Sequence, residues 1–161
     1  MDPLTQLGLL ATIAATYSGF IAVFIAFTKD GRFEVTDAHF VQAMVLGTIG
    51  VIVMSLTPPV LVLLMPAERM WFFVTVFAIA GGVPSMIYQA WQQATMPEDE
   101  RRKIPGGWHL PGWGLGVAAL AAFIAGLMYP DFRPGLYVAG VTFMLATAIW
   151  CFIAVVFRRF F

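Results

Sequence analysis

The two histidines, His39 and His109, are the side chains of this 161-residue chain best suited to acid–base or metal chemistry. Asp37 lies two residues before His39, and a second loop, 94–109, carries consecutive carboxylates before it reaches His109. Imidazoles and carboxylates at one depth can hold a metal ion, and two imidazoles can hold a haem. The chain has no HExxH, CxxC or paired-acid motif to support such a site. We therefore expect no catalytic residue, metal or cofactor, and His39 and His109 remain the candidate ligands if a metal is bound.

Hydroxyl and amide side chains recur at helical spacing inside uncharged stretches of the sequence. At about 100° per residue they form narrow stripes. Polar groups in hydrocarbon need partners, so these stripes should face protein or water. They fit either a hydrogen-bonded seam between helices or the lining of a pore or small-solute site. The lining that we expect comprises Thr12, Thr16, Ser55, Thr57, Thr75, Ser85 and Gln89.

Two of these stretches also contain residues that interrupt helices. Each proline removes a backbone donor and frees a carbonyl in the preceding turn, and a glycine pair lets the backbone bend. Broken helices near the middle of a membrane are places where transporters and some channels bind ligands. We expect the breaks to act as a gate or a binding site, with ordinary proline kinks as the alternative. The residues concerned are Pro58, Pro59, Gly81, Gly82 and Pro84.

Five uncharged stretches must position these residues. A bilayer core of about 30 Å needs roughly 20 apolar residues in a helix. Such stretches cover 3–27, 40–65, 70–92, 110–128 and 136–157, and none of the nine basic and nine acidic residues falls inside them. The sequence predicts an all-α integral membrane protein, a single domain of five transmembrane helices with no soluble domain. Four spans is the alternative, because the short, glycine-rich stretch 110–128 could be re-entrant.

The basic residues assign a side to each loop. With five spans, seven of the nine share one side, and the other side holds Arg69 and Arg133. Basic loops face the cytoplasm, so we expect the N-terminus outside and the C-terminus cytoplasmic, in a bacterial-type inner membrane. No positive charge precedes the first apolar run, so we expect no cleaved signal peptide. The seven are Lys29, Arg32, Arg101, Arg102, Lys103, Arg158 and Arg159.

The composition supports a membrane protein and excludes other classes. The chain is 60% hydrophobic and 11% charged, whereas soluble domains are about 25% charged. Its mean hydropathy of +0.85 is incompatible with a water-soluble globule or a disordered chain. A net charge of zero gives no footprint for nucleic acid. The single cysteine, Cys151, rules out an internal disulfide.

Three functions remain open, and the first is our leading interpretation. It is a non-enzymatic, homo-oligomeric channel or passive small-solute pathway, in which small residues spaced four apart, such as Ala11, Ala15 and Gly19, allow close helix contacts. The second is a non-catalytic accessory or scaffold subunit of a larger membrane complex. The third is a metal- or haem-linked membrane enzyme at the cytoplasmic rim. The expected partners are the lipid bilayer and other copies of the chain.

Overall fold

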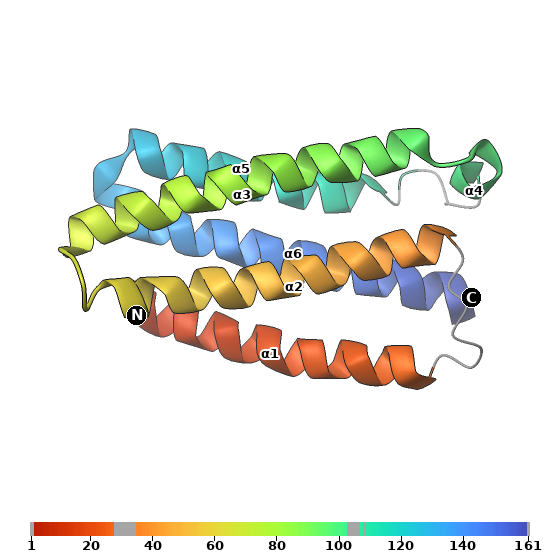
Figure 1. Ribbon diagram of the computed structural model, residues 1–161, viewed down its shortest axis with the longest axis horizontal. Coiled ribbons are helices and arrows are strands. Elements are labelled where there is room, and N and C mark those ends of the chain that lie inside the picture. The colour runs from red at the N-terminus through yellow and green to blue at the C-terminus, as the bar shows by residue number, and fades with distance from the viewer. Residues whose placement is uncertain (1, 28–34, 103–106, 108, 161) are drawn as a thin grey trace.

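The chain folds into a bundle of long helices, which the computed structural model describes over residues 2–27, 35–102, 107 and 109–160. No strand occurs in these ranges. Figure 1 shows long helices lying side by side and running back and forth along one axis. The elements are α1 (Pro3–Phe27), α2 (Val35–Leu61), α3 (Ala67–Thr95), α4 (Glu98–Arg102), α5 (His109–Met128), the 3-10 helix η1 (Pro130–Phe132) and α6 (Arg133–Phe160). We call the two ends of the bundle the η1 end, where the N-terminus lies, and the α4 end.

In the described ranges, five helices are long and apolar enough to cross a membrane, which confirms the predicted all-helical fold and the predicted number of such helices. The stretch 110–128 is one continuous helix, α5. The boundaries differ at α2, which ends at Leu61 rather than at 65, because a turn over 62–64 follows Pro58 and Pro59. The basic residues Lys29, Arg32 and Lys103, used to assign sides, lie outside the described residues.

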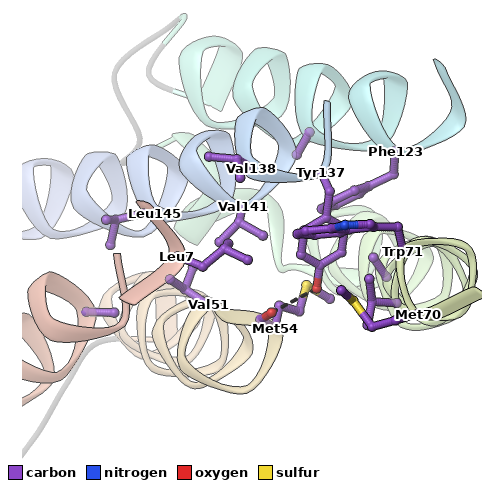
Figure 2. Packing of buried hydrophobic residues seen from close by; sticks show 14 residues of the cluster. Leu7, Val51, Met54, Met70, Trp71, Phe123, Tyr137, Val138, Val141 and Leu145 are labelled. Atoms are coloured by element: carbon purple, nitrogen blue, oxygen red, sulfur yellow. Dashed lines mark hydrogen bonds between the residues drawn. The ribbon is translucent and has the colours of Figure 1, made fainter. Parts of the chain in front are cut away.

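The core is densest towards the η1 end, where α6 packs between α2 and α5 and α3 closes the bundle. Figure 2 shows Trp71, Phe123 and Tyr137 gathered there, with Tyr137 in edge contact with Trp71 at a centroid distance of 5.7 Å. The ring of Phe123 lies directly on Gly140, where an added Cβ would come within 2.6 Å of Phe123 Cζ. This contact fixes α5 closely against α6.

The outer surface of the bundle is largely apolar, and the charged residues whose side chains are described lie near the ends of the helices. Large hydrophobic side chains are exposed on every long helix, for example Phe20 on α1 and Ile87 on α3. Among the described charged residues, Asp37 near the start of α2 is buried, and so is Arg133 at the start of α6. The Nε of Arg133 donates a hydrogen bond of 2.8 Å to the carbonyl of Gly126, which belongs to the last turn of α5. The arginine thereby pairs with a carbonyl at the end of a helix, where the last carbonyls have no N–H partner within the helix.

The prolines do not interrupt their helices, because Pro58 and Pro59 lie inside α2 and Pro84 lies inside α3. Pro58 has no N–H to donate to the carbonyl of Met54, four residues earlier. A side chain from α6 replaces the missing donor: Tyr137 Oη donates a hydrogen bond of 2.9 Å to that carbonyl, drawn as the dashed line in Figure 2. Both groups are buried, so the proline is accommodated by its neighbour.

A double-mutant cycle tests this accommodation. Tyr137→Phe should lower the free energy of unfolding by about 1–2 kcal/mol, because it leaves the buried Met54 carbonyl unpaired. In a Pro58→Ala background residue 58 regains its N–H, so the same substitution should cost about half as much or less. Denaturant titration of the detergent-solubilised protein, followed by circular dichroism, measures both costs. Equal costs in the two backgrounds would show that the tyrosine hydroxyl does not replace the proline donor.

Candidate solute cavity

A cavity of about 580 Å³ lies between α2, α3, α5 and α6, in the half of the bundle nearer the α4 end. Its lining runs from His39 to Met54 on α2 and from Gly81 to Gln93 on α3. α5 and α6 complete the lining, and no described residue of α1 takes part. The lining is mainly apolar and, in the part of the chain that the structure describes, includes no Asp, Glu, Lys or Arg side chain.

Glycines on three helices create much of this space. A Cβ added at Gly81 or Gly82 would meet nothing within 4 Å, and one at Gly116 would meet only Met86 Cε, at 3.9 Å. The cavity is therefore present where side chains are missing from the facing helices. Sequence reasoning selected Gly81 and Gly82 as site residues. It missed Gly47 and Gly50 on α2 and Gly112 and Gly116 on α5, although residues three or four apart lie on one face of a helix. The lining glycines are Gly47, Gly50, Gly81, Gly82, Gly112 and Gly116.

Part of the predicted lining comes together in this cavity, all of it from α3. Gly81, Gly82, Pro84, Ser85 and Gln89 are lining residues. In the described part of the chain, the side chains of Ser85 and Gln89 make no hydrogen bond. The glycine–proline segment thus lies against the cavity as part of a continuous helix rather than as an unwound one.

The other predicted lining residues lie elsewhere. Thr12 and Thr16 are exposed on the outward face of α1, and their hydroxyls donate to carbonyls of their own helix at 3.0 and 2.9 Å. Ser55 and Thr75 are fully buried between helices, and Thr57 donates to the carbonyl of Val53. Pro58 and Pro59 are also outside the lining. The predicted lining residues of α1, α2 and α3 therefore do not form one wall in the structure.

A hydrogen-bonded network of side chains, which we call the polar bridge, joins three helices at the α4 end of the cavity. His39 Nδ1 is 2.9 Å from Gln92 Oε1, and His39 Nε2 is 3.3 Å from Gln93 Nε2. The two contacts match the tautomer in which Nδ1–H donates to Gln92 and Nε2 accepts from Gln93. The polar bridge consists of His39, Gln42, Tyr88, Gln92, Gln93 and Trp113.

Gln92 and Gln93 connect the rest of the polar bridge. Gln92 Nε2 donates to Tyr88 Oη at 2.7 Å and to Gln42 Oε1 at 3.3 Å. Trp113 Nε1 donates to Gln93 Oε1 at 2.9 Å, which ties α5 to α3. Sequence analysis missed this network, although glutamines at positions 89, 92 and 93 recur at the spacing of one helix face.

The candidate metal ligands are arranged for packing and hydrogen bonding. His39 uses both ring nitrogens in the polar bridge, so binding a metal would break one of these bonds. His109 lines the cavity and stacks on Phe40, with centroids 5.7 Å apart and ring planes 12° apart. Among the residues that the structure describes, no three His, Cys, Asp or Glu side chains group as a metal site would require.

The cavity opens on the side of the bundle between α2 and α3. Leu46 on α2 and Tyr88 on α3 line the cavity and are also exposed, by 49% and 43%. Figure 1 shows α3 diverging from α2 towards the α4 end. Towards the η1 end the cavity stops at Met54 and Phe123, and Phe123 packs on Tyr137 at a centroid distance of 5.6 Å. Within one chain it is a pocket with a lateral opening rather than a through passage.

Comparison of the chain with protein-family models, with curated proteins and with solved structures gives no match in any of the three.

Two glutamines one turn apart on α3 give a matched test of the polar bridge. Gln92→Met should lower the free energy of unfolding by about 1–2 kcal/mol, because it removes hydrogen bonds to three side chains, each contributing roughly 0.6 kcal/mol in a membrane protein. Gln89→Met removes no hydrogen bond and should change it by less than about 0.5 kcal/mol. Denaturant unfolding in one detergent compares the two variants. Equal losses would mean that the polar bridge does not stabilise the bundle.

Proposed function

We propose that this protein is an integral membrane protein that binds a small uncharged solute in the glycine-lined cavity and passes it passively between cavity and bilayer. The observation that supports this proposal is the cavity itself, whose 580 Å³ lies in the range of about 300–1,000 Å³ for small-molecule sites. The basic residues of the loops support an orientation in which the α4 end faces the cytoplasm, in a bacterial-type inner membrane.

The chemistry of the lining selects for an uncharged solute. A buried charge needs an opposite charge or several hydrogen bonds, and no described lining residue is an acid, a lysine or an arginine. The same feature argues against transport driven by protons, which uses ionisable groups within the membrane. A passive route needs only a cavity and an opening, and the exposed Leu46 and Tyr88 mark an opening between α2 and α3.

Two glycines on α5 provide a matched test of the cavity. Gly116 lines it and Gly114 does not, and an added Cβ at Gly114 meets nothing within 4 Å. In phosphatidylcholine vesicles, a small diazirine-bearing hydrocarbon should label the cavity segments of α3 and α5 saturably on illumination. Gly116→Leu fills the space and should reduce this labelling by about tenfold, whereas Gly114→Leu should leave it unchanged.

Peptide mapping by mass spectrometry locates the label in each variant. Labelling that does not saturate, or that is equal in Gly116→Leu and the unaltered protein, would contradict binding in the cavity.

A second candidate function is the homo-oligomeric pathway, and one observation on α1 favours it. Gly8, Thr12, Thr16 and Gly19 form an exposed stripe that faces out of the bundle, and an added Cβ at either glycine meets nothing within 4 Å. The opposite face of α1, with Leu7 and others, is buried against the bundle. Small residues on an outward face allow two helices in a membrane to approach closely. A pathway would then run between copies of the chain.

Native mass spectrometry of the detergent-solubilised protein tests this assembly. The expected result is a defined homo-oligomer that Gly19→Leu dissociates, because the larger side chain separates the facing helices. Gly135→Leu is the control, since Gly135 is exposed on α6 and an added Cβ there meets nothing within 4 Å. A monomer would contradict the oligomeric pathway, and a stoichiometric complex with another protein would favour the accessory-subunit hypothesis instead.

A further inference from the structure

Three polar side chains in the cavity have hydrogen-bonding groups that the described contacts do not use. Ser85 and Gln89 lie one turn apart on the same face of α3, and His109 is the first residue of α5. Their side chains make no hydrogen bond with any described residue. This contrasts with His39, Gln92 and the other members of the polar bridge, which bond to one another. The three groups are therefore available to a ligand.

Aromatic side chains and glycines line the cavity around these groups. The ring of His109 stacks on that of Phe40 with the ring planes 12° apart, and both residues line the cavity. Trp113 and Trp150 add further aromatic lining. Gly81, Gly82 and Gly116 expose backbone without side chains, and the space beside Gly81 and Gly82 is open. A planar ring stacks on aromatic side chains and lies close to glycine backbone.

The rest of the cavity is apolar. Its η1 end is formed by Met54, Leu120 and Phe123, and its lateral opening passes the exposed side chain of Leu46. A ligand that fills both regions must be polar at the ring and apolar elsewhere. No described lining residue supplies a counter-charge for a carboxylate, phosphate or ammonium group.

We propose that the cavity binds a quinone-class lipid, an uncharged planar ring that carries carbonyl or hydroxyl oxygens and an apolar substituent. Gln89 and His109 hydrogen-bond to the ring oxygens, and Ser85 lies one turn further along the same face of α3. The ring lies against the aromatic side chains near Gln89 and His109. The apolar substituent extends along the glycine-lined part of the cavity and leaves through the opening between α2 and α3. This assignment rests on the proposed function, because it specifies the solute of the same cavity.

A pair of probes with the same shape tests the assignment. Duroquinone is a fully methylated benzoquinone, so its ring carbons are blocked against addition of the thiol of Cys151, which also lines the cavity. Durene is the corresponding hydrocarbon without the carbonyl oxygens. Dissociation constants come from the increase in Tm of the full-length protein with probe concentration, corrected for partition of each probe into the detergent. We expect duroquinone to bind about tenfold more tightly than durene, which corresponds to one good hydrogen bond.

Variants of the polar residues show whether that preference comes from this site. Gln89→Leu with His109→Phe should reduce the affinity for duroquinone by about tenfold and leave the affinity for durene unchanged. Gln89→Leu alone breaks no described hydrogen bond, so it serves as the test if the double variant does not fold, with a smaller loss in the same direction.

The outcomes separate the two proposals. If both probes bind equally and the variants change neither affinity, the cavity takes lipophilic solutes but the quinone assignment is wrong. If neither probe changes Tm in the unaltered protein, the quinone assignment is wrong again. The diazirine labelling and its loss in Gly116→Leu then decide the proposed function separately, because that probe needs no hydrogen bond.

Discussion

An apolar interior supplies few hydrogen bonds, so a buried donor or acceptor of this bundle is costly unless another part of the protein pairs with it. The carbonyl of Met54 shows the consequence most clearly, because Pro58 denies it the usual helical donor and Tyr137 on α6 supplies one from 2.9 Å away. Arg133 does the same for the carbonyl of Gly126 at the end of α5. The first contact holds α6 against the distant α2, and the second holds α6 against the preceding α5.

Glycine has two opposite effects in this bundle. At Gly140 the ring of Phe123 occupies the space where a side chain would lie, so α5 and α6 pack in close contact. At Gly81 and Gly82 no side chain lies within 4 Å of an added Cβ, and at Gly116 only the flexible end of Met86 does, so a cavity remains. The difference lies in the neighbouring side chains, because a large ring packs directly on Gly140 and none packs as closely on the other three glycines. The same residue type therefore both closes the η1 half and opens the α4 half.

Much of the architecture could be predicted from the sequence, because hydropathy and charge segregation are properties of single segments. The five apolar helices and the absence of strands in the described ranges follow directly from uncharged stretches of sufficient length. The cavity could be predicted only in part. Ser85 and Gln89 share a face of α3 with its glycines, so local spacing was enough for them, whereas Thr12 and Thr16 have the same spacing on an outward face of α1.

Which stripe faces inward depends on how helices pack, and a single segment does not contain that information. The polar bridge was missed for a related reason. His39, Gln92 and Trp113 come from three helices, and their amide and ring groups become partners only when those helices meet. The effect of Pro58 likewise depended on Tyr137, which lies 83 positions along the chain from Met54, whose carbonyl it pairs with.

The close contact of Phe123 with Gly140 has a mechanical consequence for the cavity. It prevents α5 and α6 from sliding past each other, so this side of the cavity is a rigid wall. α3 is held differently, by the core at its η1 end and by the polar bridge, which bonds it to α2 and α5 near its other end. Between these two supports it contains two glycines and a proline without an N–H donor. α3 is therefore supported at both ends opposite the wall formed by α5 and α6. A change in the distance between the middle of α3 and that wall requires α3 to bend.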